Sequence, residues 1–341
     1  MSDGGGVVIA ARDDTVPSPP RQQNGYIGRG DNPSMDRLRD ADAATLAATR
    51  PRRRFAAGDE FKDTATPASL HLFLTGGATL LAETPFGPHP VARLSAPALL
   101  DLRVAFGGSP GIARVAPEPG SVAAWFPADE ARALLFDAGA SGGAFRRLAL
   151  ASLTAALRET NAALGCFFEG MAAPPPHTRA AAGTIEDGPV DPARASDLFE
   201  TAGLDPALLP SLGLVARTVL PGAALLTAGE RGEEAFLLAE GRLRVSLEIA
   251  GAGEEALAIL RRGDIAGEMA LVDDAPRSAD IYAHGGPAVV YVLTRAVFQK
   301  LLASGAPEGA PLLAGIALVL ARRLEEAIKK AAGFRILAGP V

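Results

Sequence analysis

The stretch GEMALVDDAPRSA, from Gly267 to Ala279, carries an acidic side chain near its start and a basic one near its end. Gly267 lets the backbone approach a ligand closely, and residues 268–271 can form one helical turn. The start of a helical turn presents free backbone N–H groups, which favour an anion. Pro276 stiffens the return of the chain, and Arg277 offers a forked, permanently charged donor. The pattern predicts a pocket for a phosphate.

A carboxylate beside a phosphate clamp suits a hydroxyl group on the sugar that carries the phosphate. Glu268 supplies the carboxylate, Ser278 adds a hydroxyl donor, and the small Ala279 lets its own N–H come close to the ligand. The alternative is an ordinary surface ion pair between Glu268 and Arg277, which contributes about 0–1 kcal/mol. The Gly before the glutamate, the Pro before the arginine and the Ser-Ala after it favour the sugar-phosphate pocket.

The longer row GDIAGEMALVDDAPRSADIYA resembles the phosphate-binding cassette of cyclic nucleotide-binding domains, a family that includes the catabolite activator protein and the regulatory subunits of cyclic AMP-dependent kinase. The resemblance extends from about residue 196 to 333. It implies that Glu268 accepts the ribose 2′-hydroxyl and that Arg277 pairs with the cyclic phosphate. It assigns the rest of the cradle to five further residues: Gly267, Met269, Ala270, Ser278 and Ala279. Ala266 departs from the family pattern, which has a larger apolar residue there.

The chain also contains an internal repeat. Three pairs of segments align at offsets of 164 to 167 positions: 55–61 with 219–225, 72–81 with 236–245, and 121–135 with 288–302. An offset held within a few residues over about a hundred positions predicts a duplicated domain. In the alignment Leu102 stands where the second copy has Glu268, and Gly111 stands where it has Arg277. Because Arg103 and Arg114 lack the spacing to replace the missing arginine, we expect the first copy to have the fold without a working pocket.

Apolar segments separated by glycine-containing turns predict strands in both copies. Leucines and isoleucines at helical spacing predict a closing helix after each set of strands; they are Leu150, Leu153, Leu157 and Leu164, and then Leu313, Ile316, Leu320, Leu324 and Ile328 within 311–332. With the resemblance, the expected fold class is mainly β with helices: two tandem cyclic nucleotide-binding-type β-sandwich (jelly-roll) domains. Each domain would have N-terminal helices and a C-terminal closing helix.

Five parts are predicted along the chain. They are a disordered arm (1–33), a degenerate cyclic nucleotide-binding-like domain (34–170), a linker (171–195), the cyclic nucleotide-binding domain (196–333) and a tail (334–341). The arm is rich in Gly, Pro, Asp and Arg without periodicity, and the linker contains three consecutive prolines. The excess of arginine over lysine and the heavy use of alanine and glycine indicate a bacterial source.

Composition excludes several classes of function. A net charge of −6 argues against a protein that coats nucleic acid. The single cysteine, Cys166, and four scattered histidines give no cluster for a metal ion. The longest apolar run, 312–321, is too short to cross a bilayer, and the chain does not open with a secretory signal, so we expect a cytoplasmic protein without membrane contact.

A catalytic function is not expected, because the sequence has no serine nucleophile elbow, Walker loop or His-Glu metal motif. No cofactor is expected either. RRRFAA, residues 52–57, resembles the pseudosubstrate of kinase regulatory subunits, but the repeat alignment places 55–61 on a strand. Trp125 and Tyr291 fall in aligned strands and are expected in the core. Asp273 and Asp274 are expected in a solvated turn.

Two functions remain open. The first is a cyclic nucleotide sensor that binds ligand in its second domain and signals to an unidentified protein partner; the second is a structural or docking module of the same fold that no longer responds to ligand. Cyclic AMP is the expected ligand, with cyclic GMP as the alternative, since Ser278 discriminates poorly between them. The closing helix would pair either with another copy, giving a homodimer, or with the first repeat. Direct DNA binding is not expected, because only eight residues follow Gly333 where a helix-turn-helix would stand.

Overall fold

The computed structural model describes residues 33–62, 69–108, 112–166, 185–201, 206–249, 253–304 and 309–338. Nearly all of the predicted arm therefore lies outside the described residues, and its last residue, Pro33, begins a helix. The predicted linker is described from residue 185 onward. There it forms a strand and the start of a helix.

The first half of the chain is a sandwich of two four-stranded antiparallel sheets, with the strand orders β1-β8-β3-β6 and β2-β7-β4-β5. Buried and half-buried side chains alternate along strands such as β7, as expected for a sheet with one face in the core. The strands are β1 (Arg52–Arg54), β2 (Phe61–Lys62), β3 (Ser69–Thr75), β4 (Gly77–Ala82), β5 (His89–Ser95), β6 (Ala98–Leu100), β7 (Ala113–Pro117) and β8 (Val122–Pro127). The helices are α1 (Pro33–Ala47), α2 (Leu102–Ala105), α3 (Ala128–Phe136) and α4 (Ala140–Cys166).

The second half is a sandwich with the orders β9-β10-β17-β12-β15 and β11-β16-β13-β14. Its strands are β9 (Ile185–Gly188), β10 (Val215–Val219), β11 (Ala224–Leu226), β12 (Glu234–Glu240), β13 (Leu243–Ile249), β14 (Gly253–Leu260), β15 (Ile265–Ala266), β16 (Asp280–Ala283) and β17 (Ala288–Thr294). Its helices are α5 (Pro192–Thr201), a 3₁₀ turn (Pro206–Leu208), α6 (Leu209–Leu212), α7 (Glu268–Asp273), α8 (Arg295–Ser304) and α9 (Ala310–Ala338).

The two sandwiches have the same topology. Apart from β9, which adds to one edge, each strand of the second sandwich has the place of the strand numbered nine lower in the first. The irregularities recur as well: the register of β3 with β8 shifts after Phe73, and that of β12 with β17 shifts after Leu238, 165 positions later. Shared bulges as well as shared strand order identify the halves as two copies of one fold.

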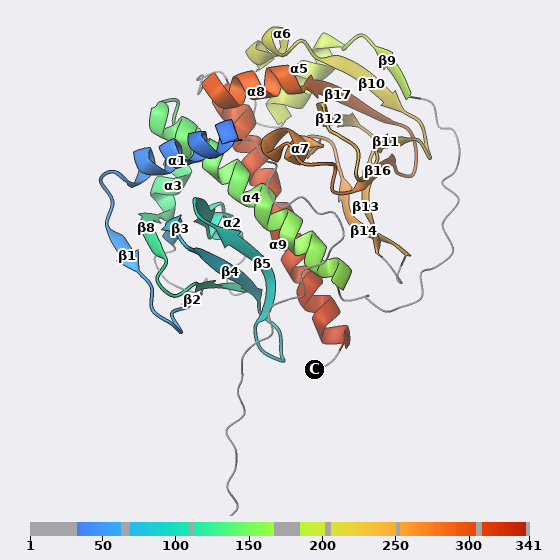
Figure 1. Cartoon of the computed structure of the whole chain (residues 1–341). Helices are drawn as coiled ribbons and strands as arrows, with labels where there is room; N and C mark the ends of the chain where they lie inside the picture. The colour runs from blue at the N-terminus through green and yellow to red at the C-terminus, as the bar shows by residue number, and fades with distance from the viewer. Residues whose placement is uncertain are drawn as a thin grey trace, which may run out of the picture.

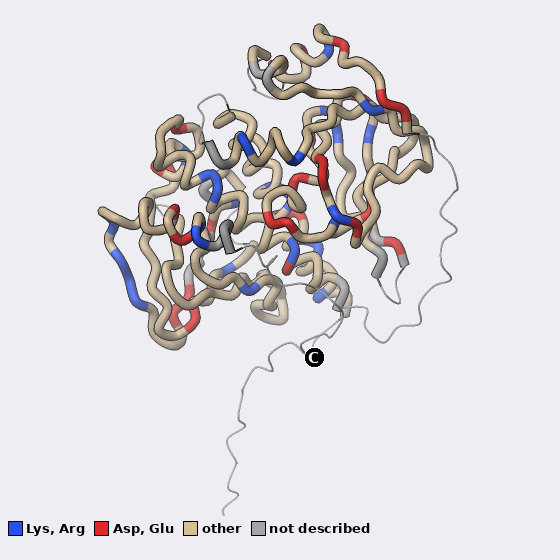
Figure 2. The backbone as a smooth tube through the Cα atoms, turned by 45° about the horizontal axis from the view of Figure 1, so that its top comes forward, with Lys and Arg blue, Asp and Glu red and all other residues tan. Residues whose placement is uncertain are grey.

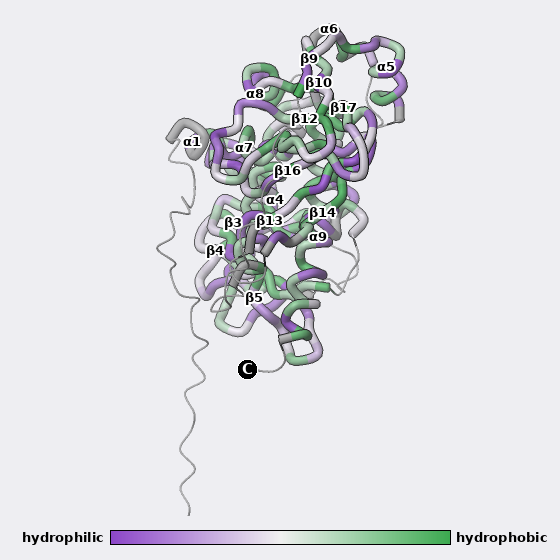
Figure 3. The backbone as a smooth tube through the Cα atoms, turned by 90° about the vertical axis from the view of Figure 1, so that its right-hand side faces the viewer, coloured by the Kyte–Doolittle hydropathy of each residue, from purple (hydrophilic) through white to green (hydrophobic). Residues whose placement is uncertain are grey.

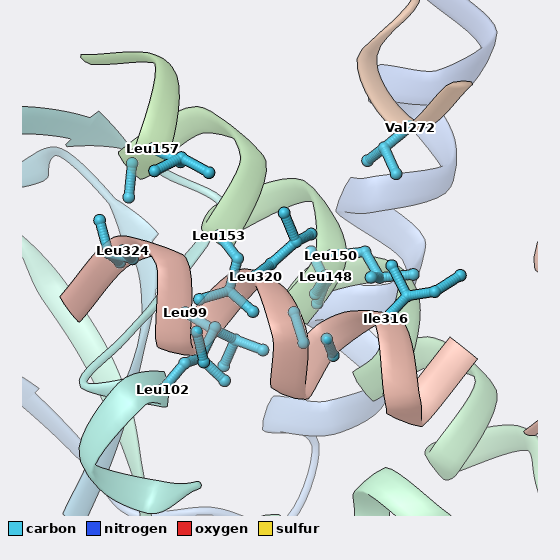
Figure 4. Close-up of a cluster of buried hydrophobic side chains, with 14 of the residues drawn as sticks. Leu99, Leu102, Leu148, Leu150, Leu153, Leu157, Val272, Ile316, Leu320 and Leu324 are labelled. Atoms are coloured by element: carbon cyan, nitrogen blue, oxygen red, sulfur yellow. The ribbon is translucent and has the colours of Figure 1, made fainter. Parts of the chain in front are cut away.

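The two closing helices, α4 and α9, pack against each other between the sandwiches (Figure 1). In the side view of Figure 3, β4 and β5 of the first sandwich lie below β12, β16 and β17 of the second. One core cluster joins the halves, and the leucines and isoleucines that predicted both closing helices are buried in it (Figure 4). A second, smaller cluster lies within the second sandwich. Of the two pairings open from the sequence, the structure has the one within the chain, and the apolar stripe of α9 is covered without a second copy.

Two predictions from the sequence differ from the structure: the start of the C-terminal tail and the burial of Trp125. The closing helix α9 extends to Ala338, so the segment predicted as a tail begins inside it. Tyr291 is buried as predicted, but Trp125 is 43% exposed on β8, and its prediction as a core residue is wrong. Tyr291 belongs to a core cluster that includes residues of α5, whereas α1 packs mainly on α4 and leaves Trp125 open to solvent. None of the described helices is long and apolar enough to span a membrane.

A shared core predicts that the two sandwiches unfold together. Leu320 is fully buried where α9 meets α4, so we expect Leu320→Ala to lower the free energy of unfolding by about 2–5 kcal/mol. Denaturant titration followed both by the fluorescence of the single tryptophan in the first sandwich and by far-ultraviolet circular dichroism measures this. Leu337→Ala on the same helix is the control, because Leu337 is 84% exposed. Separate transitions for the two signals in the wild type would contradict a shared core.

Candidate functional site

The segment from Gly267 to Ala279 starts with the short helix α7, whose backbone depends on a glycine. Gly267 has φ +79°, a left-handed conformation that side chains with a Cβ rarely adopt. A Cβ at this position would also lie 2.7 Å from Nη1 of Arg277 and 3.0 Å from the carbonyl oxygen of Glu234. Glycine is therefore needed here both for the turn and for the space that the arginine occupies.

The guanidinium of Arg277 is buried between two glycines. The residue is 8% exposed, and a Cβ at Gly232 would lie only 2.6 Å from its Cζ. Nη1 donates to the carbonyl oxygen of Gly267 and Nη2 to that of Glu234, each at 2.6 Å. Burial lowers the pKa of Arg277, and the negative charge of Glu268 partly opposes that shift. The site thus holds a desolvated cation whose charge an anionic ligand would stabilise.

Glu268 is buried more deeply still, at 1% exposure. Its Oε1 accepts a hydrogen bond from Nη1 of Arg323 on α9 at 2.8 Å. Its Oε2 is also buried and has no hydrogen-bond partner in the described part of the chain. A carboxylate oxygen in that position can accept a hydrogen bond from a ligand without losing one that it already has.

Glu268 and Arg277 line one cavity. Water can occupy about 80 Å³ of it, and the cavity is open to solvent at its mouth. Six of the seven predicted residues line it: Gly267, Glu268, Met269, Arg277, Ser278 and Ala279. The seventh, Ala270, does not; it is buried beneath the cavity wall, and its carbonyl oxygen accepts a hydrogen bond from Arg295 at 3.0 Å.

The closing helices supply wall residues that sequence reasoning missed. Three come from α4 of the first sandwich: Leu157, Asn161 and Leu164. Four come from α9: Arg323, Glu326, Ala327 and Lys330. Each set repeats at helical spacing, which places it on one helix face. That spacing is readable in the sequence, but it does not say that the two faces meet over this cavity.

A contact from α4 corrects the expectation for Asp273. This residue was predicted in a solvated turn, yet its carboxylate accepts two hydrogen bonds from Arg158, one of them from Nη2 at 3.0 Å. Nη1 of Arg158 also donates to the carbonyl oxygen of Pro276 at 2.9 Å. Helix α4 of the first sandwich therefore holds the loop that connects Glu268 with Arg277. In Figure 2, segments with Lys or Arg and segments with Asp or Glu are interspersed through the middle of the molecule.

The first copy has a different site in the equivalent place. Leu102 begins α2 just as Glu268 begins α7, and Leu102 is buried. The cavity there is lined mainly by apolar residues, including Leu324 of α9, and water can occupy only about 20 Å³ of it, against about 80 Å³ in the second copy. Arg103 lies in its wall, while Arg114 forms ion pairs with Glu60 and Glu83 instead. Gly111 lies outside the described residues.

Metal-binding side chains do not cluster in the described ranges: no group of three or more His, Cys, Asp or Glu residues there could hold an ion. The groups of the cavity that can bind a ligand by charge are its ionic side chains. Five ionic side chains line it: Glu268, Arg277, Arg323, Glu326 and Lys330. Their formal charges sum to a single positive charge, which a ligand can balance.

Comparison with known proteins points to the same segment. Residues 216–304 match the family model of the cyclic nucleotide-binding domain. A cAMP-dependent protein kinase regulatory subunit from Mycosarcoma maydis is 40% identical over 88 residues, which is 26% of this chain and 17% of that protein. A cyclic AMP receptor protein from Thermus thermophilus is 33% identical over 137 residues, covering 39% of this chain and 60% of that protein.

Solved structures show a weaker likeness. A cyclic nucleotide-binding domain from Methylobacillus flagellatus has 24% identity and a TM-score of 0.39, and covers 43% of this chain and 86% of that one. The chain spans less than a fifth of the first kinase relative, so the match concerns one domain. The second sandwich of the chain, through residues 216–304, belongs to the cyclic nucleotide-binding domain family.

The space around the guanidinium of Arg277 gives a stability prediction. We expect Gly232→Ala to displace that guanidinium, because the new Cβ would lie within 2.6–2.8 Å of its Cζ and Nε, and to lower the free energy of unfolding by about 1–3 kcal/mol. Gly286→Ala is the matched control, since a Cβ there meets nothing within 4 Å. Denaturant titration compares the two variants. Equal free energies of unfolding for Gly232→Ala and Gly286→Ala would show that the guanidinium of Arg277 does not pack tightly against Gly232.

Proposed function

We propose that the chain is a regulatory protein that senses a cyclic nucleotide, with cyclic AMP as the expected ligand, in the cavity of its second sandwich. The ligand's cyclic phosphate would lie against Arg277 and its ribose 2′-hydroxyl against Glu268. Binding would change contacts with an unidentified protein partner rather than drive a reaction. The family of residues 216–304 supports the ligand class. The relatives include a cAMP-dependent kinase regulatory subunit, a cyclic AMP receptor protein and cGMP-dependent protein kinases, so their printed descriptions support a cyclic nucleotide without separating cyclic AMP from cyclic GMP.

The observation that carries the proposal is the buried Oε2 of Glu268. A buried acceptor without a partner costs roughly 1–3 kcal/mol, so it is expected where a ligand completes the structure. A hydroxyl group is a suitable partner, because it donates a hydrogen bond to a carboxylate without adding a second charge. Arg277 lines the same cavity, which places an anion beside that hydroxyl. A sugar that carries both a hydroxyl and a phosphate fits the two groups together.

The charge of the site matches a cyclic phosphate diester, which carries a single negative charge. The ionic groups of Glu268, Arg277 and Arg323 sum to one positive charge, and the ligand would neutralise it. Arg277 uses two N–H groups on backbone carbonyls in the described part of the chain, and a guanidinium has five. Donors therefore remain for the phosphate. The lowered pKa of the desolvated Arg277 is the cost that the anion would offset.

A signal can leave the site through both closing helices. Arg323 connects Glu268 to α9, and Arg158 connects Asp273 and Pro276 to α4. A ligand hydroxyl on Glu268 would share that carboxylate with Arg323 and would alter the contact between α7 and α9. Helices α4 and α9 pack against each other in a shared core. A shift of either helix relative to the segment 267–279 would therefore be transmitted to both sandwiches.

The second candidate function is a docking module that does not respond to ligand. The occupation of Oε1 of Glu268 by Arg323 favours it, because the carboxylate is already partly satisfied without a nucleotide. Titration with cyclic AMP and cyclic GMP separates the two candidates. Heat on binding to the wild type supports the sensor, and the absence of binding by either nucleotide supports the docking module.

The phosphate contact can be tested by substitution. We expect Arg277→Ala to reduce the affinity for cyclic AMP by roughly 3–5 kcal/mol, since it removes a buried charged partner of the phosphate. Calorimetric titration of the folded variant measures this. Arg217→Ala is the matched control, because Arg217 is another partly buried arginine of this sandwich, paired with Asp187 and Glu234, and does not line the cavity. Affinity of Arg277→Ala equal to that of Arg217→Ala would rule out the proposed site.

The ribose contact can be tested from the ligand side. The 2′-deoxy form of cyclic AMP lacks the hydroxyl proposed for Oε2 of Glu268, so it should bind the wild type roughly 10- to 100-fold more weakly than cyclic AMP. In Glu268→Ala the difference between the two ligands should disappear, because the acceptor is gone. A difference that persists in Glu268→Ala would assign the hydroxyl to another residue.

A further inference from the structure

The cavity is built from both sandwiches, although only the second contains the cassette. Leu157, Asn161 and Leu164 of α4 follow one another at intervals of four and three residues and lie in its wall. This spacing puts them on a single face of the helix. Helix α4 closes the first sandwich, so one face of the first copy forms part of the ligand cavity of the second.

The position of this face relative to the cassette is fixed by nearby ionic contacts. Arg158, one residue after Leu157, binds the carboxylate of Asp273 and the carbonyl oxygen of Pro276. The side chain of Arg158 is only 14% exposed, so water screens this pair weakly. The stripe of α4 therefore keeps one register against the loop that carries Arg277.

Asn161 is the polar residue of that stripe. It is 7% exposed and lies in the cavity wall with a leucine on either side of it along the helix face. A carboxamide has two donors and an acceptor, which water in the cavity or a ligand can satisfy. A ligand that fills the cavity would displace that water and would have to replace its hydrogen bonds to Asn161.

The other polar groups of this wall are less suited to that role. Lys330 donates a hydrogen bond to the carbonyl oxygen of Ala256, and Glu326 is exposed to water. The ammonium group of Lys330 therefore has a protein partner in place of water, and the carboxylate of Glu326 keeps its water. Of these three residues, Asn161 is the one that is both buried and uncharged. Discrimination between ligands is strongest where a polar group would otherwise stay unpaired.

We propose that Asn161, supplied by the first sandwich, recognises the base of the cyclic nucleotide bound in the second. This inference rests on the proposed function. A carboxamide presents a donor beside an acceptor, which complements the adjacent amino group and ring nitrogen of adenine. The ribose and phosphate would be held by Glu268 and Arg277, so the two sandwiches would divide the ligand between them. Asn161 would then set specificity for the 6-amino group and leave the phosphate contact unchanged.

The test compares two ligands on the full chain. Cyclic AMP and purine riboside 3′,5′-cyclic monophosphate differ only in the 6-amino group, and we expect the wild type to bind cyclic AMP at least ~10-fold more tightly. In Asn161→Leu, which is similar in volume, this ratio should fall to about one, mainly through loss of cyclic AMP affinity. Thr160→Val is the matched control on α4: Thr160 is buried, bonds within its own helix to Ala156 and does not line the cavity.

The outcomes separate this inference from the function on which it rests. A ratio that collapses in Asn161→Leu and persists in Thr160→Val supports base recognition by Asn161. A ratio that persists in Asn161→Leu, or an equal weakening of both ligands, overturns it while the sensor function stands. Failure of the wild type to bind either ligand overturns the proposed function and this inference with it.

Discussion

The interaction on which the site depends is the ion pair between Glu268 and Arg323, which lies inside the protein with the guanidinium of Arg277 nearby. A lone buried carboxylate would be strongly unfavourable, and Arg323 makes its burial tolerable. The pair also joins α7 to α9 and leaves the second carboxylate oxygen of Glu268, a residue of the cavity wall, without a hydrogen-bond partner in the described part of the chain. Two glycines and two backbone carbonyl groups then hold Arg277 in place. An anionic ligand with a hydroxyl group would complete an arrangement that is otherwise under-satisfied.

The two copies of the fold contribute different parts to the cavity of the second sandwich. Both have the same strand order and the same bulge, and both end in a long helix. In the first copy, however, Leu102 stands in place of the glutamate, and Leu324 from the other copy lies in the wall of the corresponding small cavity. The first sandwich instead provides α4, which forms the core with α9 and reaches the cassette through Arg158. A copy without the acidic residue of the cassette can therefore still shape the site of its neighbour.

The parts of the fold that depend on local spacing were predictable from the sequence. The duplication follows from the repeat, and the sandwich fold follows from the resemblance of the cassette. Six of the seven cassette residues lie together because only a few positions separate them. The partner of the α9 stripe was not predictable, because an apolar stripe does not specify what covers it. The contacts of Arg158 with the cassette and the place of Asn161 in the cavity wall depend on that packing and were missed for the same reason. Trp125 was misplaced because alternation along a strand identifies two faces but not which helix covers the outer one.

A crystal structure of the chain grown with cyclic AMP tests the central claim most directly, since that claim places one ligand between named groups of a single cavity. The account predicts density for one nucleotide per chain, with its cyclic phosphate within hydrogen-bonding distance of Arg277 and its 2′-hydroxyl on Oε2 of Glu268. An empty cavity at saturating ligand, or a nucleotide that contacts neither side chain, would contradict it.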